Sequence, residues 1–372
     1  MEQVQVSWLR SRMSLGRWLG PWTPALRVPG GVTRRRLRHT HGGHTTAMSL
    51  YTPDHRPPIG SLLVAHGVHF LGPIDPRFDR FCRVLARAGW AVMAPSMIAY
   101  RALVPDETVP RDFRVAFEAL RAQPGVPKSR PGIFSISFGA MPALHLASDP
   151  DYVDKIGGLV VFGGYADWTD TLRYMIDGHV PGASHDDQSN PLNRPVVFMN
   201  VLPFLDEPLD GTEELIGAWR RYVECVWPDP EMKHPDRHRP IAAAIEQTLP
   251  THLRRLFRLG CGVEPGGDPL VIKALQRGDP DREALLDLKP RLAAVRCPVT
   301  LVHGVSDDVI HHSQIDVLAA GLTRAAAVRR LRTGLYGHSS SDRPGMSAII
   351  GELHSLFQTL DGIACAATDA RR

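Results

Sequence analysis

The sequence predicts an α/β fold in which helices flank a mostly parallel sheet and a mostly helical stretch interrupts the core. Short apolar runs alternate with helical patterns from position 61 to position 162 and again from position 298 onward. These runs are apolar at successive positions, as in parallel strands that helices cover on both faces. The alternation stops over residues 168–290, and this stretch is too long to form a single loop. We therefore expect an insertion in the middle of the domain.

The expected elements follow one another in a regular order. A hairpin is expected over residues 32–56, with strands at 32–37 and 45–51 around a Gly-rich turn. Further strands are expected at residues 61–68, 90–95, 132–134, 157–162, 298–304 and 327–331. Helices are expected at residues 79–88, 110–122, 140–146, 213–226, 241–257, 269–276, 313–320 and 347–360. Within the insertion, the apolar run 195–199 predicts one isolated strand.

The hairpin also contains three histidines, His39, His41 and His44. We expect surface histidines rather than a metal site, because neither Cys nor a carboxylate accompanies them in the sequence.

Composition and charge exclude several classes of protein. Residues 1–47 carry eight Arg and one Glu, so the basic character belongs to this segment and the rest has a small negative charge. Nucleic-acid binding is therefore not expected. Five scattered Cys without a C-x-x-C pair predict reduced thiols in a cytoplasmic protein. No apolar run is long enough to predict a membrane span.

Residues 1–31 are rich in Arg and Trp and are expected to form a disordered extension. Two alternatives remain open, because apolar residues fall at helical spacing there. The segment 1–27 would then associate with a membrane surface, or act as a targeting segment. Such an extension would result if the start codon of the sequence were placed too early and the true start were Met13 or Met48.

Ser137 lies in the stretch Ser135-Ile136-Ser137-Phe138-Gly139, between an apolar run and a helical pattern. A strand, a tight turn with a central Ser and a helix together predict a nucleophile elbow. The turn holds the Ser in a strained conformation, so the residues two before and two after it must be small. Gly139 meets this demand fully and Ser135 less fully. Taken alone, the stretch is equally compatible with a turn that performs no chemistry.

A second feature, His66-Gly67, ends the strand expected at 61–68. A backbone turn there can direct the N–H of Val68 toward the same point as the N–H of Phe138. Two such donors form an oxyanion hole, which stabilises charge that develops in the transition state. His66 is a candidate for orienting this loop rather than for acting as a base.

Carboxylates and a histidine follow the late strands. Asp307 comes just after the strand at 298–304, and His338 lies in the loop after the last strand. A serine nucleophile needs a histidine to take its proton and a carboxylate to orient that histidine. Asp308 is the nearest alternative acid, although it could instead cap the next helix, and Asp167 is a more distant one.

These motifs, in this order, resemble the α/β-hydrolase family, and the resemblance covers most of residues 48–167 and 291–372. It departs from the family's usual motif at Ser135, which replaces a Gly. The resemblance implies an α/β-hydrolase core at 32–167 plus 291–372 and a cap or lid at 168–290. The site residues it implies are the nucleophile Ser137, the acid Asp307, the base His338, the oxyanion-hole residues Val68 and Phe138, and the supporting residues His66, Gly67 and Gly139.

The resemblance implies a serine hydrolase that cleaves a carboxylic ester or related acyl bond of a small molecule through an acyl-enzyme. It implies neither a metal ion nor an organic cofactor. Two alternatives stay open, an acyltransferase with the same triad and a catalytically silent binding protein. The sequence predicts neither the identity of the substrate nor the oligomeric state.

Overall fold

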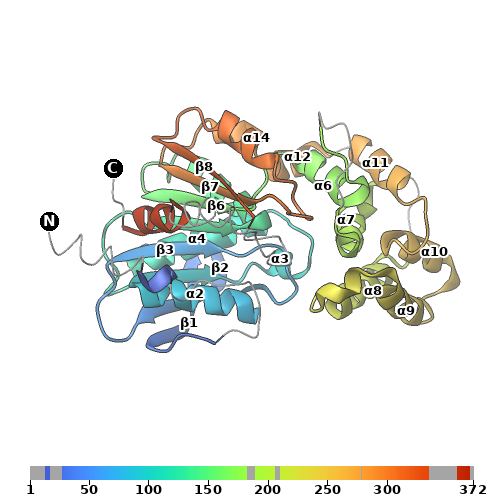
Figure 1. Ribbon diagram of the computed structural model, residues 1–372, viewed down its shortest axis with the longest axis horizontal. Coiled ribbons are helices and arrows are strands. Elements are labelled where there is room, and N and C mark those ends of the chain that lie inside the picture. Colours follow the sequence, from blue (N-terminus) through green and yellow to red (C-terminus); the bar gives the residue numbers. More distant parts are fainter. Residues whose placement is uncertain are drawn as a thin grey trace.

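An eight-stranded sheet forms the centre of the molecule (Figure 1). The computed structural model describes residues 13–16, 27–181, 189–205, 210–277, 279–334 and 358–368. The strand order is β1-β2-β4-β3-β5-β6-β7-β8, with β3 to β8 parallel and β2 antiparallel to both of its neighbours. The strands are β1 (Val32–His41), β2 (His44–Pro53), β3 (Gly60–Ala65), β4 (Trp90–Pro95), β5 (Gly132–Ile136), β6 (Gly158–Phe162), β7 (Val299–Gly304) and β8 (Val328–Thr333).

Helices connect the strands and also make up the insertion. Those of the core are η1 (Gly72–Ile74), α2 (Pro76–Ala88), α3 (Ile98–Arg101), α4 (Thr108–Ala122), η2 (Ser137–Gly139), α5 (Ala140–Ser148), α14 (Gln314–Gly321) and a helix at 358–368. Those between β6 and β7 are α6 (Trp168–Asp177), η3 (Pro191–Asn193), α7 (Arg194–Val201), η4 (Leu202–Phe204), α8 (Thr212–Val226), η5 (Pro230–Lys233), α9 (Pro235–Glu246), α10 (Thr251–Gly260), α11 (Asp268–Arg277), α12 (Pro280–Leu286) and α13 (Lys289–Leu292). The predicted fold class is therefore confirmed.

Helix α2 shows how local chemistry sets the boundaries of an element. Its N-cap is Asp75, whose side chain accepts the backbone N–H of Arg77 at 2.8 Å, and Pro76 fits the first turn. The helix ends at Gly89, which adopts a left-handed φ of 115° that other residues rarely tolerate. The helix therefore begins three residues earlier than the pattern predicted, because the Asp-Pro start lies outside the apolar periodicity.

Three sequence predictions were wrong. The run 195–199, predicted as a strand, belongs to helix α7, because a short buried apolar run does not distinguish the two structures. The single helix predicted at 241–257 is two helices, α9 and α10, since Pro250 precedes the first residue of α10 and interrupts the pattern. The closing helix does not end at Leu360 but continues through residue 368, and the first part of that prediction lies outside the described residues.

The two faces of the sheet are covered by different helices. Helix α2 and the helix at 358–368 pack on one face, in one cluster of buried side chains with Val64 and Phe134. Helices α4, α5 and α14 share a second cluster with residues of the other face and with the insertion. In Figure 1 the insertion extends to one side of the sheet, with α10 farthest from it.

The helix at 358–368 approaches the sheet backbone closely, and glycines make this approach feasible. A methyl group on Gly60 of β3 would lie 2.0 Å from the carbonyl oxygen of Ala367. One on Gly132 of β5 would lie 2.4 Å from the carbonyl oxygen of Ala366. Both distances are far below van der Waals contact, so the helix can occupy this position only where the strands carry no side chain.

We expect Gly132→Ala to lower the free energy of unfolding by about 3 kcal/mol, because the new methyl group displaces backbone rather than a flexible side chain. Gly217→Ala in α8 is the matched control, since its methyl group would meet nothing closer than Arg221 at 3.7 Å. The control should be neutral or stabilised by up to about 1 kcal/mol. Urea unfolding of both variants measures the difference, and equal stabilities would contradict the packing described here.

Candidate active site

Ser137 lies at the turn between β5 and α5, and its backbone is strained. Its φ is 54°, and Leu103 is the other non-glycine residue with a positive φ in the described part of the chain. Left-handed backbone of this kind is uncommon outside glycine and is often found at functional sites. The side chain of Ser135 points instead into the sheet, where its hydroxyl donates to the carbonyl of Val160 at 3.3 Å. The backbone at Ser137 is therefore a tight, strained turn between a strand and a helix.

Glycines allow the loop after β3 to contact this turn. A methyl group on Gly139 would lie 2.7 Å from the carbonyl oxygen of Ala65. A methyl group on Gly67 would lie 3.2 Å from Cβ and 3.6 Å from Oγ of Ser137. The backbone at Gly67, immediately before Val68, is therefore adjacent to the serine hydroxyl.

A further contact fixes the residue after Ser137. The Tyr100 hydroxyl of α3 donates to the carbonyl oxygen of Phe138 at 2.6 Å. This bond holds the peptide between Phe138 and Gly139. The N–H of Phe138 lies in the first turn of a helix, where it has no intrahelical acceptor. The sequence did not point to Tyr100, because nothing in its local pattern connects α3 with the elbow.

His66 is buried beneath this loop. Its Nδ1 lies 2.7 Å from the carbonyl oxygen of Gly67, and its ring packs edge-on against Phe78 and Tyr100. Burial lowers the pKa of His66 to about 4, so the ring is neutral near neutral pH. A neutral ring that donates from Nδ1 to the next carbonyl holds the backbone at Gly67 in place.

Acidification is expected to destabilise the protein through His66 and His69, whose pKa values are both lowered to about 4, first by burial. Unfolding restores the ordinary pKa of about 6.5. Between these values the unfolded state binds more protons than the folded state, so stability falls as the pH drops through this window. The largest slope is about 1.4 kcal/mol per pH unit for each histidine.

Unfolding free energies measured across this window test that expectation. His66→Gln should reduce the slope, whereas His252→Gln, at an exposed position, should leave it unchanged. An unaltered slope in His66→Gln would show that the histidine is not buried in a neutral form.

Asp307 is held in a defined orientation after β7. It is 5% exposed, and its Oδ1 accepts the backbone N–H groups of Val309 at 3.0 Å and Ile310 at 2.9 Å. Its Oδ2 lies 3.3 Å from Nε2 of His303, and its backbone carbonyl accepts the hydroxyl of Tyr174 at 3.1 Å. These contacts fix the carboxylate within a polar shell, as is required of a group that must orient a second side chain.

The two alternative acids make other contacts. The Asp308 carboxylate pairs with Lys233 of η5. Asp167 is the N-cap of α6, where it accepts the N–H of Asp170 at 2.9 Å, and it also pairs with Lys289. Asp308 therefore joins the core to the insertion, and Asp167 stabilises a helix start.

The turn Gly163–Gly164 lies between Ser137 and Asp307. It follows β6, which is paired with β5 on one side and β7 on the other. A methyl group on Gly163 would lie 3.3 Å from Oδ2 of Asp307, and one on Gly164 would lie 3.7 Å from the carbonyl oxygen of Ser137. The structure thus brings the predicted nucleophile and acid to the same edge of the sheet. The predicted base, His338, lies outside the described residues.

The strand–turn–helix with a strained Ser at the carboxyl end of a mostly parallel sheet is decisive for the fold. The fold is of the α/β-hydrolase type. No family model matches the chain, and no curated protein matches it.

Solved structures similar to this chain carry the names of hydrolases. Pyrococcus horikoshii acylaminoacyl peptidase is 13% identical with a TM-score of 0.45, covering 90% of this chain and 40% of its own. A 2,6-dihydroxy-pseudo-oxynicotine hydrolase is 13% identical with a TM-score of 0.47, and the match covers 90% of this chain and 68% of the hydrolase. The esterase domain of a Rhodothermus marinus protein is 14% identical with a TM-score of 0.42, and the match covers 88% of this chain and 98% of the esterase domain. The chain thus spans about two fifths of the length of the peptidase, and likenesses this distant do not decide its activity.

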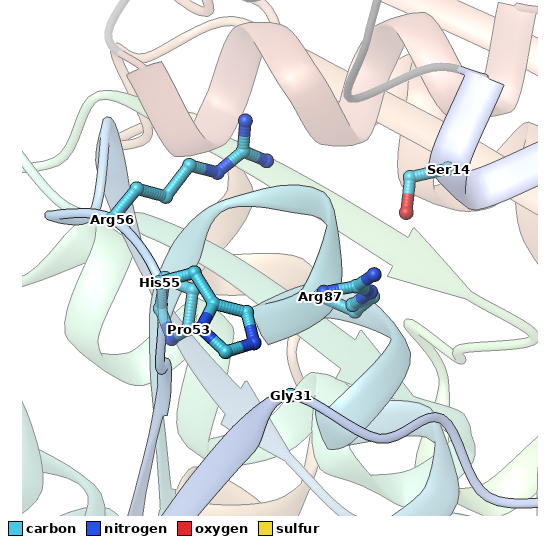
Figure 2. A pocket seen from close by; sticks show the side chains of 6 residues that line it. All are labelled: Ser14, Gly31, Pro53, His55, Arg56 and Arg87. Carbon is cyan, nitrogen blue, oxygen red and sulfur yellow. The ribbon is translucent and has the colours of Figure 1, made fainter.

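A basic pocket of about 310 Å³ lies between the end of α2 and the segment that joins β2 to β3 (Figure 2). Its lining residues are Ser14, Gly31, Pro53, His55, Arg56 and Arg87. Arg56 donates to the carbonyl oxygen of Ala88 at 3.0 Å, and Arg87 lies in the last turn of α2. Cations at a helix C-terminus complement its dipole. These arginines therefore stabilise the end of α2.

Two features are absent from the described residues. None of their helices is both long and apolar enough to span a bilayer. Within the same ranges, no group of three or more His, Cys, Asp or Glu is placed to hold a metal ion.

Proposed function

We propose that the protein is a serine hydrolase that cleaves a carboxylic ester or related acyl bond through an acyl-enzyme. The observation that carries this proposal is the strained backbone of Ser137, in contact with the loop after β3. A buried, hydrogen-bonded Asp307 at the end of a nearby strand supports it. Strain of this kind places the serine oxygen at the end of the sheet, where a substrate can reach it.

In this proposal His338 takes the hydroxyl proton of Ser137 as the oxygen attacks the acyl carbon. The resulting oxyanion accepts the N–H groups of Val68 and Phe138. The tetrahedral intermediate then expels the alcohol, which receives the proton from His338, and leaves an ester on Ser137. Water, deprotonated by His338, attacks this ester and releases the acid. Asp307 holds His338 in the required tautomer and stabilises its protonated form.

A fluorophosphonate probe, which labels activated serines, tests the proposal on the full-length protein. We expect labelling of the wild type, its loss in Ser137→Ala, and strongly reduced labelling in His338→Ala. Circular dichroism confirms that each variant is folded. If the folded wild type neither reacts with the probe nor hydrolyses p-nitrophenyl acetate, the proposal is wrong.

A further inference from the structure

Three aromatic side chains lie together beside the proposed oxyanion hole. His69 and Phe70 directly follow Val68, and their rings stack with centroids 4.5 Å apart. The ring of Trp227, at the end of α8, lies 5.6 Å from that of His69 and 6.4 Å from that of Phe70. We call these three residues the aromatic wall. All three are half-buried, so part of their surface remains accessible.

Trp227 belongs to the insertion, yet it is held firmly against the core loop. Its Nε1 donates to the carbonyl oxygen of Leu192 at 3.0 Å. The insertion is in turn tied to the loop that carries Asp307, because Asp308 pairs with Lys233 and its carbonyl accepts the N–H of Asn190 at 2.8 Å. The wall is therefore pre-organised, with one part from the core and one from the insertion.

The wall is uncharged near neutral pH, although charged groups lie close to it. Burial lowers the pKa of His69 to about 4. Nδ1 of His69 lies 3.2 Å from the N–H of Leu71, and Nε2 lies 3.6 Å from Oδ2 of Asp75. Asp75 pairs with Arg77, so the charges behind the wall compensate each other. Such a surface suits an aromatic ring, which can stack on it or meet it edge-on.

We propose that the aromatic wall binds an aromatic ring of the substrate next to the scissile carbonyl, so that the substrates are esters with an aromatic ring close to that carbonyl. This inference rests on the proposed function. Val68 is to donate to the carbonyl oxygen, and the next two residues along the chain, His69 and Phe70, belong to the wall. A ring attached close to the carbonyl carbon can then stack on the wall, with the geometry that aromatic pairs prefer.

Matched ester pairs test the inference, with acid release followed in a pH-stat. Methyl phenylacetate is compared with methyl cyclohexylacetate, and benzyl acetate with cyclohexylmethyl acetate. Each pair has the same carbon skeleton and differs in whether the ring is aromatic. In at least one pair, we expect kcat/KM for the aromatic ester to exceed that for the saturated ester by about three- to tenfold. This ratio corresponds to the usual free energy of an aromatic contact. The pair that shows the preference identifies the acyl or the alcohol side.

Trp227→Leu should bring that ratio close to one while fluorophosphonate labelling of Ser137 persists. Phe204→Leu is the control, because Phe204 is a half-buried aromatic of the insertion that contacts Arg282 instead of the wall. Two outcomes would overturn this inference and leave the proposed function intact. In the first, Ser137 is labelled but the wild type shows no preference for the aromatic ester. In the second, the preference is unchanged in Trp227→Leu. If Ser137 is not labelled and no ester is hydrolysed, both this inference and the proposed function are wrong.

Discussion

Replacing Asp307 by Asn is expected to slow fluorophosphonate labelling and ester hydrolysis roughly 10⁴-fold near neutral pH. The amide has nearly the shape of the carboxylate, so the N–H groups of Val309 and Ile310 still find an acceptor at 3.0 and 2.9 Å. What is lost is the negative charge that, in the proposed mechanism, orients His338 and stabilises its protonated form. The fold should therefore survive while the chemistry fails.

Asp308→Asn is the matched control for this measurement. Its carboxylate pairs with Lys233, so its loss should reduce the rate less than about tenfold through a looser insertion. The reverse ranking of the two variants would assign the acid to Asp308. Equal, small effects in both variants would leave Asp167 as the remaining candidate for the acid.

The second large effect is expected from Gly139→Ala. The new methyl group would lie 2.7 Å from the carbonyl oxygen of Ala65 and 3.0 Å from that of His66. Both are backbone atoms, so the end of β3 and the elbow must separate. The N–H groups of Val68 and Phe138, which we propose as the oxyanion-hole donors, would then move apart. Loss of one such donor costs roughly 10²- to 10³-fold in rate.

Gly30→Ala provides the comparison, because no atom lies within 4 Å of its new methyl group. Rates and unfolding free energies should be measured for both variants. A Gly139→Ala protein with normal activity would show that the loop after β3 does not contribute to the site.

The sequence predicted those parts of the structure that depend on local pattern. The β1–β2 hairpin, the buried strands and the elbow at Ser137 follow from apolar periodicity and turn residues. Asp307 could be placed near Ser137 because parallel strands direct their carboxyl ends to one edge. The contacts of Tyr100 with Phe138 and of Lys233 with Asp308 could not be predicted, since they join segments that are distant in the chain.

Helix α7 shows where apolar periodicity fails to identify the secondary structure. Its apolar residues are buried nearly all round, so neither a helical nor a strand pattern stands out in the sequence. Helices α6, α8, α10 and α11 of the insertion pack around it.

The position of the insertion between β6 and β7 has a consequence for the order of folding. Phe162 and Val302 are paired in the sheet, although the whole insertion separates them along the chain. Contacts of such high sequence separation must close a long loop before they become favourable, and they slow folding. Strands β1 to β6 depend on nearer neighbours and can pair before this closure. A refolding chain would then regain its secondary structure first, and acquire a reactive Ser137 only when β7 brings Asp307 into place.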